Sequence, residues 1–280
     1  MIVLRNVTKV YATGKEALGG VTLAVPRRDF VFLVGANGAG KSTLLKLLIR
    51  EEKASSGAII VAGHDLQLLP DQKVATFRQQ IGIVFQDIRL FPAKTIMENV
   101  AFSLQVSGLP RRRKTADLVA EALELVGLQH HAKRFPHQVS GGEQQRAAIA
   151  RAIVRSPQLL IADEPTANLP PDVSWQIIQL LAEINRRGVT VVVATHDQAV
   201  VDATRRRVVE LSAGRIVRDQ HYGTFLPGYG GAAGGASTTS NSTALHPIVP
   251  PAGPSVLAPR PLSAAPDSGL YPEVPAHHRV

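Results

Sequence analysis

A phosphate-binding loop is predicted at residues 35–43, which read GANGAGKST and fit the pattern G-x-x-x-x-G-K-[S/T]. Glycines let the backbone curl so that consecutive N–H groups point at phosphate oxygens, and a helix that begins there adds roughly half a positive charge. In this pattern the Lys41 side chain would reach the β- and γ-phosphates, and the Ser42 hydroxyl would ligate Mg²⁺. The candidate phosphate-binding residues are Gly35, Asn37, Gly38, Gly40, Lys41, Ser42 and Thr43.

Polar side chains at the ends of three apolar segments could complete a hydrolytic site. LLIADEP at 159–165 ends in two carboxylates: Asp163 suits the Mg²⁺ shell, usually through water, and Glu164 suits a general base that polarises the attacking water. His196 closes VTVVVATH and could contact the γ-phosphate, while Gln86 ends IGIVFQ and could sense Mg²⁺ and the water. The alternatives are a solvated turn for the Asp-Glu pair, a structural role for His196 and an ordinary polar residue at Gln86. The phosphate loop elsewhere in the chain favours the catalytic interpretation of these residues.

A second glycine loop, QVSGGEQQR at 138–146, continues into AAIARAIV with helical apolar spacing. A serine hydroxyl and backbone N–H groups at a helix start can capture an anion. The same letters S-x-x-E also fit a capping box between Ser140 and Glu143. Both functions are compatible, so Ser140, Gly141 and Gly142 are candidate anion-binding residues.

These residues need a frame of alternating strands and helices. Buried strands are expected at FVFLV (30–34), QLLIA (158–162), VTVVVA (189–194) and RVVEL (207–211). Helical spacing is found at 115–126, 143–154 and 173–187. Alternation of this kind predicts an α/β fold with a mostly parallel sheet covered on both faces, and the strand-poor stretch at about 88–155 suggests a helical insert.

Composition divides the chain near residue 223. Residues 223–280 are rich in Gly, Pro, Ser and Thr, and their four charges cancel, so the whole net charge of +9 lies in residues 1–222. We expect residues 1–222 to form the folded domain and 223–280 to be a disordered tail. A solvated extension is the expected role of this tail, with a partner-binding segment as the alternative.

The excess of basic residues favours an anionic partner, but the basic runs at 111–114 and 205–207 are expected to be solvated surface, not a specific nucleic-acid site. No cysteine is present, which excludes thiolate chemistry. The N-terminal letters do not fit a signal peptide, and no apolar run reaches the length of a spanning helix. The chain is therefore expected in the cytoplasm, and any work at a membrane would need a partner.

The order and spacing of these motifs resemble the ATPase domain of ABC transporters, over residues 1 to about 222. The stretches YATGKEALGGVTL, FRQQIGIVFQDIRLFPAKTIMENVAF and QVSGGEQQR are similar to the FtsE family of bacterial cell-division ATPases. The resemblance implies a P-loop NTPase fold, ATP and Mg²⁺ as cofactors, and a homodimer on ATP binding in which Ser140, Gly141 and Gly142 complete the partner chain's site. It also implies that Tyr11 stacks on adenine, as an alternative to a packing role.

In that family the ATPase pairs with an integral membrane protein, FtsX, and relays ATP turnover to peptidoglycan hydrolases outside the cell. The resemblance thus implies a peripheral location at the cytoplasmic face of the inner membrane, with other division-site proteins as possible partners. One departure is Pro170, which stands where the family carries an aspartate that helps to link the two sites; Asp172 is a possible substitute. The alternatives are a lipoprotein or macrolide exporter ATPase, and an ATP-gated scaffold with weak hydrolysis.

Overall fold

The structure, a computed structural model, describes residues 1–105 and 115–221. The predicted tail at 223–280 and the basic run at 111–114 lie outside the described residues. The strands are β1 (Ile2–Val10), β2 (Glu16–Val25), β3 (Phe30–Val34), β4 (Ser56–Val61), β5 (His64–Asp65), β6 (Ile81–Val84), β7 (Leu159–Asp163), β8 (Thr190–Ala194), β9 (Arg207–Ser212) and β10 (Arg215–Gln220). The helices are α1 (Lys41–Leu48), α2 (Asp71–Arg78), α3 (Ile96–Gln105), α4 (Thr115–Leu125), α5 (Gly141–Ile153), α6 (Pro171–Arg186) and α7 (Gln198–Thr204), with 3₁₀ turns at Gln129–His131 and Pro136–Gln138.

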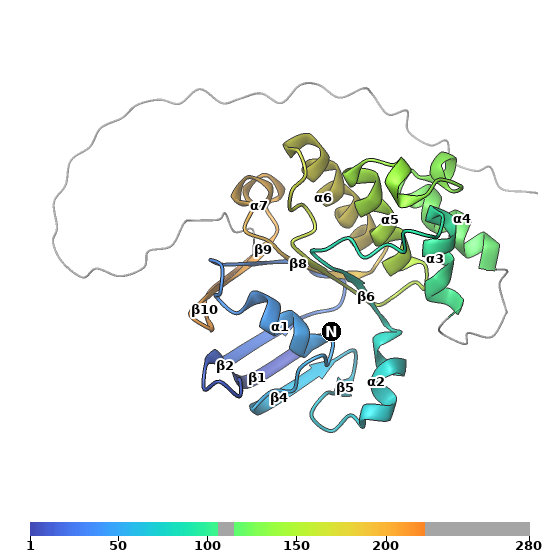
Figure 1. The fold of residues 1–280 in the computed structure, drawn as a ribbon. Helices are drawn as coiled ribbons and strands as arrows, with labels where there is room; N and C mark the ends of the chain where they lie inside the picture. The colour runs from blue at the N-terminus through green and yellow to red at the C-terminus, as the bar shows by residue number, and fades with distance from the viewer. Residues whose placement is uncertain (106–114, 222–280) are drawn as a thin grey trace, which may run out of the picture. The chain divides into compact units, whose positions relative to one another are not determined.

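The core sheet has the order β10-β9-β3-β8-β7-β6 (Figure 1). All of its pairings are parallel except that of β10 with β9 at one edge. The predicted α/β fold with a mostly parallel sheet is confirmed, and the four predicted strands correspond to β3, β7, β8 and β9. Their sequences are continuous apolar runs because both faces of the sheet are covered.

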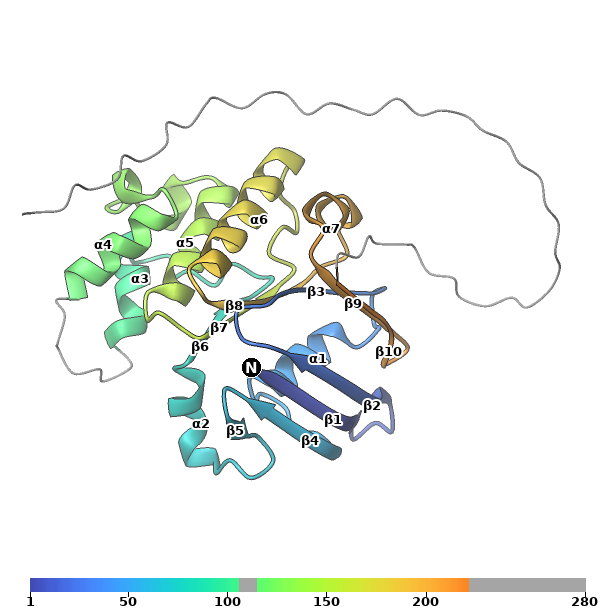
Figure 2. The same cartoon turned by 180° about the vertical axis from the view of Figure 1, so that it is seen from behind.

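Successive residues of the central strand β3 enter two different hydrophobic cores. Phe30, Phe32 and Val34 pack with apolar side chains of α3 to α7, and Val31 and Leu33 pack with α1 and a second sheet. Figure 2 shows the same arrangement, with α3 to α7 on one side of the core sheet and α1 on the other. Helix α1 is thus enclosed between two sheets.

The second sheet, with the order β2-β1-β4-β5, is antiparallel and was not predicted from the sequence. Only one of its faces is covered, so its apolar residues alternate with polar ones. In β1 the alternation is further broken by register shifts against β2 and β4. A search for continuous apolar runs therefore passes over these strands.

Between β6 and β7, the described residues form α3, α4, α5 and the two 3₁₀ turns, without a strand. A buried amide organises the start of this region: Asn99 is fully buried, and its Nδ2 donates to the carbonyl oxygens of Phe91, Lys94 and Thr95 at 3.0–3.1 Å. Its Oδ1 accepts the N–H of Phe91 at 2.7 Å. The loop between Gln86 and α3 is thereby fixed to the helix that follows it.

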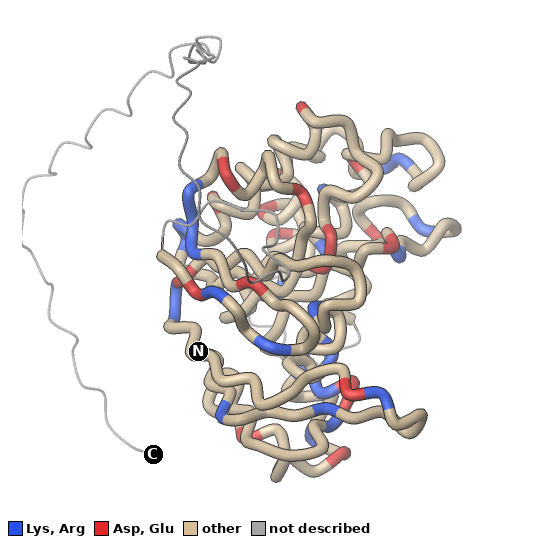
Figure 3. The backbone as a smooth tube through the Cα atoms, turned by 90° about the vertical axis from the view of Figure 1, so that its left-hand side faces the viewer, with Lys and Arg blue, Asp and Glu red and all other residues tan. Residues whose placement is uncertain are grey.

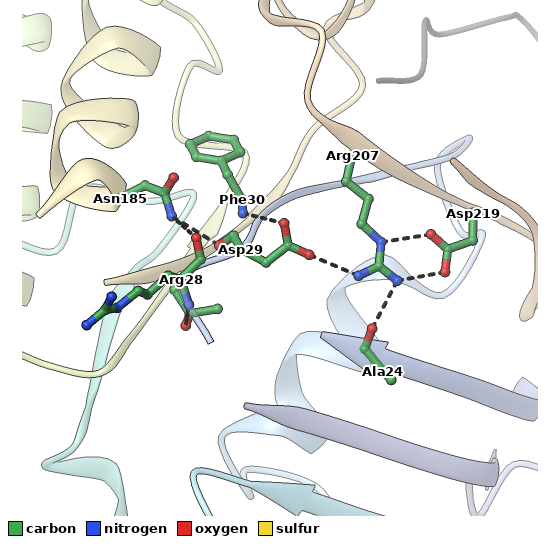
Figure 4. Close-up of polar contacts among 8 residues, drawn as sticks. Ala24, Arg28, Asp29, Phe30, Asn185, Arg207 and Asp219 are labelled. Carbon is green, nitrogen blue, oxygen red and sulfur yellow. Dashed lines mark hydrogen bonds and ion pairs between the residues drawn. The ribbon is translucent and has the colours of Figure 1, made fainter. Parts of the chain in front are cut away.

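One buried arginine joins segments from both ends of the described chain (Figure 4). Arg207 donates to both oxygens of Asp219 at 2.8 Å, to Asp29 Oδ2 at 2.9 Å and to the carbonyl of Ala24 at 2.9 Å. These hydrogen bonds raise the pKa of Arg207 against the opposing effect of burial. The expectation of a solvated run at 205–207 is therefore wrong for Arg207, because the fold buries its side chain between Asp219 of the neighbouring strand β10 and Asp29, which is 178 residues away.

In the view of Figure 3, Lys and Arg are interspersed with Asp and Glu over much of the described chain. Among the described residues, no helix is both long and apolar enough to cross a membrane.

Replacing Arg207 by Met should lower the free energy of unfolding by about 2 kcal/mol or more, because Asp29 and Asp219 lose the cation that compensates them. The nearby exposed Arg205→Met is the control and should change stability by less than about 0.5 kcal/mol. Urea unfolding followed by circular dichroism measures both. Equal unfolding midpoints for the two variants would contradict a stabilising role of the Arg207 contacts.

Candidate nucleotide site

The predicted phosphate loop leads from the end of β3 into the first residue of α1. Gly35, Gly38 and Gly40 have φ of 145°, 80° and 109°, which favour glycine. A Cβ on Gly35 would lie 2.3 Å from the carbonyl oxygen of Leu211, and one on Gly40 would lie 2.8 Å from that of Ala17. The loop therefore needs glycine both for its conformation and for its fit against neighbouring strands.

A cavity of about 310 Å³ lies over this loop and gathers most of the predicted site residues. Segments that are far apart in the sequence form its wall, because the carboxyl ends of parallel strands meet at one edge of the sheet. Lys15 and Ala17, just before and within β2, also line it, and no motif in the sequence signalled them. The lining residues are Tyr11, Lys15, Ala17, Asn37, Gly38, Gly40, Lys41, Ser42, Thr43, Gln86, Glu164 and His196.

The carboxylate of Glu164 lies between Lys41 and His196. Its Oε1 is 3.8 Å from Lys41 Nζ, and its Oε2 is 2.9 Å from His196 Nδ1 and accepts the backbone N–H of His196 at 3.3 Å. Lys41 Nζ also donates to the carbonyl of Gly35 at 2.8 Å. Glu164 and Lys41 are buried, whereas the His196 side chain is 62% exposed. A buried carboxylate with these partners can accept a proton from a water molecule in the cavity.

The backbone of Glu164 is in the left-handed region, with a φ of 47°. For a residue other than glycine this conformation costs about 1 kcal/mol or more. The N–H of Glu164 donates to the carbonyl of Ala194 at 2.9 Å, which fixes the turn against the end of β8. The strained turn directs Glu164 toward the cavity instead of continuing the line of β7.

Asp163 provides an oxygen suited to a metal ion. Burial raises the pKa of its carboxyl group, and a hydrogen bond with the Ser42 hydroxyl opposes this effect. Within the described residues, Asp163 Oδ1 is buried without a hydrogen-bond partner. Hard oxygen ligands of this kind, together with the Ser42 hydroxyl and the amide oxygen of Gln86, fit the coordination that Mg²⁺ prefers. The predicted metal residues Ser42, Gln86 and Asp163 thus have suitable chemistry for the ion.

The second glycine loop does not line this cavity. Ser140 caps α5: its N–H and hydroxyl donate to Glu143 Oε2 at 2.7 and 2.8 Å, and its oxygen accepts the N–H of Glu143 at 3.3 Å. These bonds lower the pKa of Glu143. The predicted capping box is confirmed, and Ser140 and Gly141 are exposed. Their binding to the nucleotide of a second chain stays a prediction.

Gly142 and Pro170 lie where α5 and α6 begin. A Cβ on Gly142 would be 2.5 Å from Val173 Cγ1, so this glycine also allows the two helices to approach closely. Pro170 is the N-cap residue of α6 and provides no side-chain capping bond. Asp172 lies in the first turn of α6, exposed to solvent, and does not take the place of Pro170 in the loop.

A phosphate loop between a core strand and a helix, with Glu164 at a strand end close to its lysine and His196 bound to Glu164, defines an ATPase of the P-loop class. The family model described as "ABC transporter" matches residues 18–167. A solved dimeric ATP-binding cassette in a post-hydrolysis state with ADP and Pi is 35% identical, with a TM-score of 0.71, and the match covers 80% of this chain and 100% of that chain.

Similar proteins of known name show to which group of ABC ATPases the chain belongs. The cell division ATP-binding protein FtsE of Bacillus subtilis (strain 168) is 46% identical over 225 residues, which are 80% of this chain and 98% of the relative. FtsE of Mycobacterium tuberculosis (strain ATCC 25618 / H37Rv) is 48% identical over 226 residues, with 80% and 98% coverage. The chain belongs to the ABC transporter family of ATPases and, within it, to the FtsE group of cell-division ATP-binding proteins. It is an ATPase.

Replacing Asp163 by Asn should stabilise the chain when nucleotide and Mg²⁺ are absent. Burial raises the pKa of Asp163, so its ionised form costs folding free energy at pH 8, and this cost falls as pH decreases through the raised pKa. We expect the variant to melt at a higher temperature than wild type at pH 8, and the difference should become smaller as the pH falls through the raised pKa of Asp163. Differential scanning calorimetry measures this, and a variant less stable than wild type at pH 8 would contradict it.

Proposed function

We propose that the chain is the ATPase subunit of a bacterial cell-division complex, and that it transmits ATP-driven conformational change to a membrane partner resembling FtsX. The similarity to FtsE over nearly the full length of these relatives supports this proposal. Through that partner, the ATPase cycle regulates peptidoglycan hydrolysis outside the cell. The chain then lies at the cytoplasmic face of the inner membrane, held there by its partner.

Within the site, Lys41 pairs with the β- and γ-phosphates, and the backbone N–H groups of the glycine loop hold the same oxygens. Ser42, Gln86 and Asp163 would hold Mg²⁺, and the bound ion would supply charge to neutralise the phosphates and polarise the scissile group. Glu164 accepts the proton of the attacking water, and His196 orients Glu164 and contacts the γ-phosphate. Contacts of the Glu164 carboxylate with Lys41 and His196 are the observation that carries this assignment.

ATP binding joins two copies of the chain. Ser140, Gly141 and Gly142 do not line the cavity of their own chain. Ser140 and Gly141 are exposed at the start of α5, whereas Gly142 is buried, and the exposed helix start supports binding of a second chain's nucleotide. The dimeric ATP-binding cassettes among the solved structures support the same assembly.

Pro170 favours a second candidate function, that of an ATP-gated scaffold with weak hydrolysis. Proline carries neither a carboxylate nor an N–H, and Asp172 does not take its place in the loop. In this alternative the chain binds ATP and dimerises, but the two sites communicate poorly. The rate of ATP turnover with the membrane partner present separates the two functions.

Replacing Glu164 by Gln should retain ATP binding and reduce turnover by on the order of a hundredfold or more, because the amide cannot accept the proton of the water. Nucleotide binding by calorimetry and phosphate release measure the two effects. Wild-type turnover in this variant would assign the general base to another residue.

Mixing two defective chains tests whether Ser140 acts on the partner's nucleotide. Lys41→Ala removes the phosphate-binding cation, and Ser140→Arg blocks the second loop, so each homodimer should be inactive. A mixed dimer has one site with both defects and one with none, because that site takes its phosphate loop and its Ser140 from different chains. With equal random mixing, up to roughly a quarter of wild-type ATPase should return if the sites act independently.

The control for this mixture is Glu164→Gln with ATP, which should trap a dimer visible by light scattering. If the control forms dimers and no mixing ratio restores activity, Ser140 serves its own chain or the sites are obligatorily coupled. If ATP does not bring the chains together at all, the composite site is wrong.

A further inference from the structure

The surroundings of Tyr11 support an inference that rests on the proposed ATP site and on the stacking of Tyr11 on adenine, which the resemblance to ABC ATPases implies. Tyr11 follows β1 and is half-buried at the wall of the cavity. Its hydroxyl lies 3.3 Å from Thr43 Oγ1, in the first turn of α1. The ammonium of Lys9 lies over the ring, with Nζ 4.9 Å from the ring centroid. One face of the ring is therefore occupied by a cation of the chain itself.

Lys9 is held in place by the segment that follows α1. It is only 9% exposed, and its Nζ donates to Glu52 Oε2 at 2.7 Å and to the carbonyl oxygen of Lys53 at 2.9 Å. Tyr11 comes directly after Val10, the last residue of β1, and the pairing of β1 with β2 shifts register between Lys9 and Val10, so Lys9 approaches Tyr11 at the irregular end of the strand. The ammonium of Lys9 is therefore held in one position over the Tyr11 ring, whereas the ammonium of a solvated lysine would move freely.

The backbone around Tyr11 is also fixed. The N–H of Tyr11 donates to the carbonyl of Lys15 at 3.0 Å, and its own carbonyl accepts the N–H of Gly14 at 2.9 Å. The N–H of Val10 donates to Ser55 Oγ at 2.9 Å. Through its hydroxyl and through Lys9, the ring is connected to both ends of α1, the helix that begins at the phosphate loop.

We propose that Lys9 is a positioning residue for adenine recognition, because its ammonium occupies one face of the Tyr11 ring and presents the opposite face to the base. A cation over an aromatic face is attracted by the ring quadrupole. A ring already held in its binding orientation loses less conformational entropy when the base stacks on it. The phosphate groups, in contrast, are bound by residues that Lys9 does not touch, so the effect of Lys9 depends on the base.

The test compares ADP with tripolyphosphate, which lacks a base, both with Mg²⁺ and measured by calorimetry on the full chain. Lys9→Met should weaken ADP binding about two- to fivefold and leave tripolyphosphate affinity unchanged. The matched control is Lys53→Met, which removes a lysine ammonium that pairs with Asp71 and keeps the backbone carbonyl that Lys9 contacts, and it should change neither affinity. Equal losses for both ligands in Lys9→Met, or no loss for either, would overturn the proposal.

Variants of Tyr11 separate this proposal from the stacking on which it rests. Tyr11→Ala should weaken ADP binding. In a chain that already carries Tyr11→Ala, adding Lys9→Met should cause no further loss of ADP affinity. An unchanged ADP affinity in Tyr11→Ala refutes stacking itself, and independent losses in the double variant refute the positioning role alone. If Lys9→Met does not fold, Glu52→Gln loosens the anchor of Lys9 and should give a smaller loss with the same dependence on the base; no such loss would overturn the proposal.

Discussion

The enclosure of α1 between two sheets is the constraint on which the site depends. Leu44 and Leu48 of this helix are buried in the core that joins the antiparallel sheet to the core sheet, so the helix cannot shift without opening that core. Its N-terminus, with Lys41 and the partial positive charge of the helix, is therefore fixed before any phosphate is bound. The strand ends that carry Asp163 and His196 belong to the same sheet, and their distances from Lys41 are set by strand pairing.

The sequence predicted the parts of the molecule where local pattern and tertiary environment agree. FVFLV at 30–34 is apolar throughout because both its faces are buried. Glu164 and His196 were predicted as site residues because each follows an apolar strand of the same kind. The antiparallel sheet was not predicted because only one of its faces is covered and β1 shifts register. Lys9 and Lys15 reach the site only through the tertiary fold, and Arg207 was misassigned because its partner Asp29 is 178 residues away.

The capping of α5 places a physical condition on the second glycine loop. The Ser140 hydroxyl donates to Glu143 Oε2, so its proton is already committed within the chain. An anion from a second chain must then be bound mainly by backbone N–H groups at the helix start, or the Ser140 hydroxyl must turn away from Glu143. Helix capping and nucleotide binding in trans thus share one hydroxyl, which links the integrity of α5 to the state of the dimer interface.

The position of β3 at the centre of the core sheet has a consequence for how the protein is synthesised. Its two neighbours are β8 and β9, whose residues Val191 and Arg207 pair with Phe30 and Val31. During translation, the phosphate loop and α1 leave the ribosome long before either neighbouring strand exists. Until then β3 is an apolar segment with two unpaired edges, so the nascent N-terminal half exposes an aggregation-prone stretch until β8 and β9 have been synthesised.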